Sequence, residues 1–310
     1  MDKLQRAITV AAIGGVGLTL LASPAQAKGD EMGGVGERYF LNDSFNGSAN
    51  HVLTYGEGRD RAYVGDWDGN GTDTLMLRRG NAFHVRNGNT TGGADSTFSY
   101  GDPGDTVLVG DWDGNGTDTL AVRRGGTYHV KNTVSSGYAD TVFSYGDPGD
   151  AVLVGDWDGD DDDTLVVRRG GRYFVKNDLN TGFSESDFYY GNPGDSVLVG
   201  HWSADQEGDA LGVRRGGIYH LRNSLTSGPA DTVFGYGNPS DTAFVGDWNG
   251  DGIDSLGVRR PTSPSRDLDC PDFPSKREAQ AYFDYYHPYY GDVARLDADN
   301  DMEACESHFG

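Results

Sequence analysis

The residues of this chain best suited to chemistry are aspartates and asparagines that alternate with glycines in short loops. The first such loop carries Asp66, Asp68 and Asn70, and Thr72 follows at the seventh position. Oxygen ligands at positions one, three, five and a carbonyl at seven hold Ca²⁺ in calcium-binding loops. We therefore predict calcium ligands in this loop. The matching positions of three further loops complete the predicted set: Asp111, Asp113, Asn115, Thr117; Asp156, Asp158, Asp160, Asp162; Asp247, Asn249, Asp251, Ile253.

An alternative without metal exists for the same loops. Asp and Asn side chains also accept hydrogen bonds from nearby backbone N–H groups, forming Asx-turns. A fourth copy, which begins at His201, has lost the alternation of ligand residues, and we expect no ion there.

These loops belong to an internal repeat. The pentapeptide Gly-Asp-Trp-Asp-Gly at 65–69 returns at 110–114 and 155–159, in degenerate form from 200, and as Gly-Asp-Trp-Asn-Gly at 246–250. The spacings are 45, 45, 45 and 46 residues, and all five tryptophans occupy the same repeat position. A fixed period of this length indicates a repeat architecture.

Each repeat contains four runs of alternating apolar residues, which in the second copy span 119–124, 127–131, 141–145 and 151–157. Period-two alternation bounded by Gly, Pro, Asn and Asp indicates strands, and four short antiparallel strands per repeat are typical of a propeller blade. The segment 38–43 matches the second strand of a repeat, and 255–260 matches the first.

The predicted fold class is therefore all-β. We expect a five-bladed propeller over 37–260, with twenty strands, followed by a small C-terminal module with one helix. Three strands before the first full repeat and one strand after the last should form a single blade and close the ring, because closure removes exposed edges. A β-helix or a string of separate modules is the alternative.

Two further residue types recur with the repeat. We expect the tryptophans to lie in the core, with a solvent-facing ring that stacks on sugars as the alternative. The Arg-Arg pairs (78–79, 123–124, 168–169, 214–215, 259–260) should form ion pairs with the surplus aspartates, or else pockets for an anionic glycan.

The chain ends differ from the repeats. Residues 1–27 have a basic start, an apolar run and an Ala-x-Ala site, the pattern of a cleaved secretory signal. Residues 28–36 read as a linker, and so do 261–266. In the module at 267–310, Ser275 and Glu278 form a capping box, and we expect His287-Pro288 to end the helix that follows.

Asp297, Asp299, Asp301, Glu303 and Glu306 follow that helix with calcium-loop spacing; a solvated acidic tail is the alternative. Cys270 and Cys305 are the only cysteines. Since both fall in this module, we predict a disulfide between them in an oxidising compartment.

These motifs resemble two known families. The repeats resemble FG-GAP or VCBS repeats, which build propellers with calcium in such loops. That family has a carboxylate at loop position nine, where this chain has Thr74, Thr119, Thr164 and Ser255. The C-terminal pieces Cys-Pro-Asp-Phe, Leu-Asp and Ala-Cys-Glu resemble an Excalibur domain, an extracellular calcium-binding module. The resemblance implies side-chain ligation by Asp297, Asp299, Asp301 and Glu306 and a carbonyl from Glu303, with Met302 replacing a glycine.

The net charge of −23 excludes some partners. Nucleic acid and anionic membranes would be repelled, and we find no catalytic motif, so we predict no enzyme. The sequence predicts a secreted, monomeric, calcium-binding protein of the bacterial envelope that binds a glycan or a surface partner. A structural or protein-interaction scaffold, or the non-enzymatic remnant of a cell-wall hydrolase architecture, is the alternative.

Overall fold

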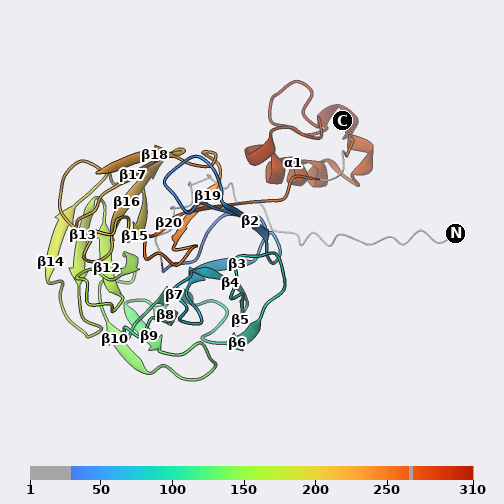
Figure 1. Cartoon of the computed structure of the whole chain (residues 1–310). Coiled ribbons are helices and arrows are strands. Elements are labelled where there is room, and N and C mark those ends of the chain that lie inside the picture. Colours follow the sequence, from blue (N-terminus) through green and yellow to red (C-terminus); the bar gives the residue numbers. More distant parts are fainter. Residues whose placement is uncertain (1–28, 265–267, 310) are drawn as a thin grey trace.

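A computed structural model describes residues 29–264 and 268–309. The predicted secretory signal at 1–27 lies outside these residues, as does part of the predicted linker at 261–266. The described chain forms twenty strands in five four-stranded antiparallel sheets, arranged in a ring (Figure 1). The predicted five-bladed propeller is confirmed.

Each blade runs from an innermost strand at the propeller axis to an outermost strand at the rim. The first blade contains β3 (Arg61–Gly65), β4 (Thr74–Arg79), β5 (Ala82–Val85) and β6 (Ser96–Ser99). The second contains β7 (Thr106–Gly110), β8 (Thr119–Arg124), β9 (Thr127–Lys131) and β10 (Thr141–Ser144). The third contains β11 (Ala151–Gly155), β12 (Thr164–Arg169), β13 (Arg172–Lys176) and β14 (Ser186–Tyr189). The fourth contains β15 (Ser196–Gly200), β16 (Ala210–Arg215), β17 (Ile218–Leu221) and β18 (Thr232–Gly235). The fifth contains β19 (Thr242–Gly246), β20 (Ser255–Arg260), β1 (Arg38–Leu41) and β2 (His51–Thr54).

The fifth blade closes the ring, but not with the division of strands that we predicted. Two strands come from each end of the chain, with β20 paired to β1, rather than three N-terminal strands and one C-terminal strand. The prediction took each Asp-rich loop as the link between blades. In the structure that loop is a hairpin inside one blade, since Gly110 pairs with Thr119 across it. The blade boundary lies instead at the Asp-Pro-Gly-Asp turn.

The core is shared between neighbouring blades. One hydrophobic cluster joins Tyr63 and Trp67 of the first blade to Val107 and Leu120 of the second. Inner strands are buried on both faces and the outermost strand β10 on one, which matches the alternation in sequence. Because each blade buries its face only against the next, closure of the ring completes the core.

The C-terminal module contains η1 (Cys270–Asp272), α1 (Lys276–Tyr290) and α2 (Glu306–Phe309). Ser275 caps α1 as predicted, and its side chain accepts the Glu278 N–H. The prediction that His287-Pro288 ends the helix was wrong. Pro288 lies in the last turn, where its missing N–H removes one hydrogen bond, and the helix ends when the Gly291 N–H donates to the His287 carbonyl.

Residues 29–36, predicted as a linker, run along the innermost strands. The Gly29 carbonyl accepts the Val109 N–H at 2.6 Å, and the Met32 N–H donates to the Ala62 carbonyl at 2.7 Å. Met32 is 2% exposed. The segment therefore fills part of the space around the propeller axis and contacts several blades.

Tyrosines of α1 contact the propeller. The Tyr290 hydroxyl donates to the Pro261 carbonyl at 2.6 Å, and burial together with nearby Glu37 raises the pKa of Tyr285 to about 12. No helix in the described part of the chain is long and apolar enough to cross a membrane.

Candidate functional site

Strand direction places all the Asp-rich loops at one end of the propeller. Each innermost strand runs into its loop and the second strand leaves from it. The longer loops between the third and fourth strands, such as 132–140, lie at the same end, because antiparallel strands alternate in direction. We call this end the loop face, and the opposite end, with turns such as 102–105, the turn face.

The first aspartate of each intact loop binds backbone N–H groups of its own loop. Asp66 Oδ1 accepts from Gly69 at 2.9 Å, and Oδ2 accepts from Gly71 at 2.6 Å. Equivalent bonds are made by Asp111, Asp156 and Asp247. The Asx-turn interpretation is thus correct for these residues. It does not compete with calcium, since a carboxylate has about four lone-pair sites.

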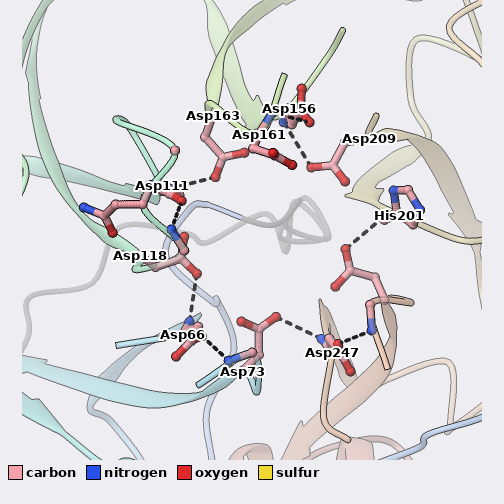
Figure 2. Close-up of a pocket in the computed structure, with 16 residues that line it drawn as sticks. Asp66, Asp73, Asp111, Asp118, Asp156, Asp161, Asp163, His201, Asp209 and Asp247 are labelled. Atoms are coloured by element: carbon pink, nitrogen blue, oxygen red, sulfur yellow. Dashed lines mark hydrogen bonds between the residues drawn. The ribbon is translucent and has the colours of Figure 1, made fainter. Parts of the chain in front are cut away.

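A second aspartate in each loop connects neighbouring blades. The Asp118 Oδ2 atom accepts the Asp66 N–H at 2.8 Å, while the Asp118 N–H donates to the Asp66 carbonyl at 2.8 Å. The same reciprocal contact recurs around the ring, which it closes (Figure 2). The other four pairs are Asp111 with Asp163, Asp156 with Asp209, His201 with Asp254, and Asp247 with Asp73.

This inter-blade role was missed from the sequence. The second aspartate stands at position eight of the intact loops, next to the position where the resembled family has its ninth ligand. One signal was present: Asp209 persists in the fourth repeat, which has otherwise lost its ligands. Position nine itself begins a strand, and Thr119 there is 2% exposed and paired with Gly110.

The ring surrounds a cavity of about 510 Å³ at the loop face (Figure 2). Its lining includes ten aspartates and His201 but no Lys or Arg. Burial raises the pKa of Asp111 and of Asp247 above the ordinary value. The cavity is therefore strongly negative and repels anions.

The third loop brings its predicted ligands together. Ligand oxygens of Asp156, Asp158 and Asp160 all lie within 4.8 Å of one another. Two ligands on opposite sides of a calcium ion would be separated by about twice the Ca–O distance of 2.3–2.6 Å. Burial, and then repulsion by Asp160 and Asp156, raises the pKa of Asp158. A divalent cation would relieve this repulsion.

The other intact loops hold their ligand residues differently. The Asn115 amide donates to Asp113 Oδ1 at 2.5 Å, and the Asn249 amide donates to Asp251 Oδ2 at 3.1 Å. In the third loop, burial and then repulsion by Asp160 raise the pKa of Asp162, the residue at position seven.

The fourth loop holds itself together with an amide side chain. Gln206 Oε1 accepts the Trp202 N–H at 3.2 Å, and its Nε2 donates to the carbonyls of Gly200 and Gly208 at 3.1 and 2.5 Å. This neutral side chain satisfies backbone groups inside the loop, so the loop closes without carboxylate ligands.

The C-terminal module also brings its predicted ligands together. Oxygens of Asp297, Asp299 and Asp301 lie within 4.8 Å of one another. Asp297 accepts the N–H groups of Asp301 and Met302, at 3.1 and 2.8 Å. Met302 has a φ of 73°, the left-handed conformation that favours glycine. The chain therefore holds a non-glycine residue in a conformation that glycine adopts most readily.

Two glutamates complete the module's acidic loop. The Glu306 Oε2 atom is buried and has no hydrogen-bond partner among the described residues, a position that suits a cation ligand. The Glu303 carboxylate pairs with Lys276 Nζ at 2.7 Å, so its predicted contribution is restricted to the carbonyl. The predicted Cys270–Cys305 disulfide is present, with 5.6 Å between the Cα atoms.

The arginine pairs are structural. Arg79 forms a bidentate ion pair with Asp60 of its own blade: Nε donates to Oδ1 at 2.7 Å and Nη2 donates to Oδ2 at 2.6 Å. Arg78, which is 2% exposed, donates instead to the Asp105 and Asp102 carbonyls of the next blade. The expected ion pairing is confirmed for the second arginine, while the first joins blades through carbonyls. The tryptophans are 3–5% exposed and lie in the core, as predicted.

Two exposed aromatic side chains on the loop face were missed from the sequence. Tyr138 and Phe183 are each 94% exposed, and they occupy the same place in the second and third blades. Asp140, which accepts the Asn132 N–H at 2.9 Å, holds the first of these loops. The sequence signal was an aromatic residue directly after Gly137 and again after Gly182.

Comparisons with known proteins leave the family open. No family model and no curated protein matches the chain. Among solved structures, BBS1N in complex with ARL6DN, soaked with lead, is similar over 73% of this chain and 74% of that one. The identity is 14% and the TM-score 0.33. The assignment of a five-bladed propeller therefore rests on the strand pairing described above.

Proposed function

We propose that this is a secreted, non-catalytic calcium-binding protein of the bacterial envelope whose propeller binds an extracellular glycan. One observation carries the calcium part. The carboxylates of Asp297, Asp299 and Asp301 converge, and Glu306, which follows in the same module, has a buried Oε2 atom with no hydrogen-bond partner among the described residues. Calcium prefers such oxygen ligands, and its charge would offset the repulsion among them.

The C-terminal module is proposed to be of the Excalibur type and the propeller repeats of the FG-GAP or VCBS type. In the propeller, Asp156, Asp158 and Asp160 would hold a second ion. The loops with Asn115 and Asn249 would bind more weakly, because an amide there replaces a carboxylate and ligand charge sets affinity. The disulfide supports an oxidising location outside the cytoplasm.

The exposed aromatics support the glycan part. A phenyl ring that is 94% exposed gains nothing from folding, whereas stacking against a sugar would cover its apolar face. Tyr138 and Phe183 stand singly in polar loops, and a stable protein interface needs a larger continuous surface, about 800 Å² per partner.

Calcium binding is tested by calorimetry on the full mature chain. Asp299→Asn with Asp301→Asn should abolish the tightest site, and Asp158→Asn with Asp160→Asn should abolish a separate one. Asp178→Asn, an exposed aspartate outside both clusters, is the control. Unchanged stoichiometry in both double variants would refute the calcium proposal.

Secretion and glycan binding need separate measurements. The protein collected from culture supernatant should begin at Lys28 by N-terminal sequencing. A glycan array should give signal that falls with Tyr138→Ala and Phe183→Ala, while Tyr189→Ala, at an exposed aromatic on β14, leaves it unchanged. If this chain pulls down an envelope protein from an extract but gives no signal on the glycan array, the scaffold alternative is favoured.

A further inference from the structure

The segment 29–36 runs along the propeller axis toward the loop face. Met32 forms a bridge with Ala62, the second residue of the innermost strand β3. Three residues nearer the N-terminus, the Gly29 carbonyl accepts the N–H of Val109, the fourth residue of the innermost strand β7. Both strands run from the turn face to the loop face. The N-terminal end of the segment therefore lies at the loop-face end of the axis.

Gly29 is held between two innermost strands, directly below the acidic cavity of the loop face. A Cβ added to Gly29 would lie 2.5 Å from the Val154 Cβ and 2.8 Å from the Val109 carbonyl oxygen, closer than side chains approach other atoms. Two residues after these valines come Asp156 and Asp111, which line the cavity. The segment thus reaches the floor of the cavity at a position where only glycine fits.

Covalent geometry restricts where the preceding residue can be. Residue 28 lies outside the described residues, but its Cα is about 3.8 Å from that of Gly29 across a trans peptide. On the turn-face side, the axis is occupied by residues 30–36, of which Met32 is 2% exposed. The two innermost strands that touch Gly29 close the sides. The open space next to Gly29 is the cavity, whose volume is about 510 Å³.

The residue at position 28 has the charge that the cavity lacks. Lys28 is the only basic residue between Arg6 and Arg38. After the expected signal cleavage, Lys28 would be the first residue and would carry both an α-ammonium and a side-chain ammonium at neutral pH. Ten aspartates line the cavity without a Lys or Arg among the described lining residues, and burial raises the pKa of Asp111.

We propose that signal cleavage supplies the cation for this cavity: the α-ammonium and the side-chain ammonium of Lys28 bind among its aspartates. Hydrolysis of the Ala27–Lys28 bond consumes one water, leaves a carboxylate on the leader and places the new ammonium on this chain. The bound groups belong to the chain itself, and the position of Gly29 delivers them to the site. This inference rests on the proposed secretion and gives the new N-terminus a structural role.

The uncleaved precursor would lack this arrangement. Its position 28 carries an amide N–H instead of an ammonium, and residues 1–27 would have to leave through the cavity. The propeller should therefore become more stable on cleavage, because two positive charges offset part of the repulsion among the aspartates. A precursor that folds less stably than the mature chain is also easier to keep unfolded during export.

The test compares forms of the chain that differ at the N-terminus. One form begins at Lys28, one retains residues 22–27, and one begins at the same place with Lys28→Gln. Arg277→Gln, which removes a positive charge from an exposed site on α1, is the control. Each form is released from a fusion tag by a site-specific protease, so that its first residue does not depend on processing by the cell.

Thermal unfolding in chelator is the first readout. The extended form and Lys28→Gln should unfold roughly 3–6 °C below the form that begins at Lys28, because each loses charge-assisted contacts. Arg277→Gln should unfold within about 1 °C of it, as surface substitutions do. Equal stability of all the forms would overturn the inference and leave secretion in place.

Reactivity of the α-amine is a second readout, which a purely structural effect would not change. Neighbouring carboxylates keep an amine protonated and unreactive, so an amine-reactive ester should label the N-terminus about tenfold more slowly in the folded chain than in urea. Asp161→Asn, in the cavity lining, should speed this labelling, whereas the exposed Asp178→Asn should not.

Two results separate the inference from the secretion proposal. Equal labelling rates in folded and unfolded chain would overturn the inference alone. A protein from culture supernatant that begins elsewhere than at Lys28 would overturn the proposed cleavage and, with it, the inference. N-terminal sequencing distinguishes these two failures.

Discussion

Replacing Asp163 separates a structural role from a metal-ligand role for the aspartates that connect the blades. Asp163 is 6% exposed, and its Oδ2 accepts the Asp111 N–H at 2.9 Å. Asp163→Ala removes a charge-assisted bond and leaves that N–H without its acceptor. Such a loss costs about 2 kcal/mol.

The matched change Asp163→Asn keeps an oxygen in the same place. We expect Asp163→Asn to be as stable as wild type or slightly more so, because it also removes one negative charge from the cavity at the loop face, which ten aspartates line. For a chain of this size, about 2 kcal/mol lowers the melting temperature by ~4–8 °C, and this drop is expected for the alanine variant alone.

Differential scanning calorimetry in chelator measures these stabilities, and calcium titration follows on the same samples. Asp178→Ala, at an exposed site, should change stability by no more than about 0.5 kcal/mol. Equal destabilisation by Asn and Ala would refute the hydrogen-bond account. Loss of one bound calcium ion in Asp163→Asn would show that position eight supplies a ligand.

Four further predictions concern other parts of the chain. Cys305→Ser opens a disulfide of sequence separation 35 and should destabilise the C-terminal module by about 3–4 kcal/mol, seen as an earlier calorimetric transition. Met302→Gly relieves a φ of 73° and should raise calcium affinity several-fold by titration; unchanged affinity would contradict the strain argument. Met32→Ala, at 2% exposure, should cost about 2–4 kcal/mol in urea unfolding, whereas a peripheral linker would show almost no change. Hydrogen bonding to Arg169 holds the pKa of Asp150 below its ordinary 3.8. The pair's contribution is therefore present above pH 3.8 and lost as the pH falls through the lower folded value; Arg169→Met should flatten the fall in urea midpoint in that range.

Local regularities made much of this fold readable from sequence. The 45-residue period and the strict placement of the tryptophans predicted twenty strands in five blades, because alternation and turn residues act over a few neighbouring positions. The loop spacing likewise predicted which carboxylates would converge, as Asp156, Asp158 and Asp160 do. The Ser275 cap was predictable for the same reason, since its bond partner is three residues away.

Other features depend on contacts that no short window of sequence contains. A repeat length does not show where one blade ends and the next begins, so it could not show that the Asp-rich loop is a hairpin within a blade. Pro288 removes one backbone hydrogen bond without ending α1, because the Gly291 N–H still closes the last turn on the His287 carbonyl.

The reciprocal contacts between the Asp-rich loops of neighbouring blades were decided by tertiary structure alone. The Asp66 N–H meets an aspartate 52 residues away in the next blade. The Asp247 N–H meets Asp73, 174 residues away, only once the ring has closed. Sequence by itself determined what each repeat becomes, and the closure of the ring determined which groups the repeats present to one another, because those contacts exist only between blades.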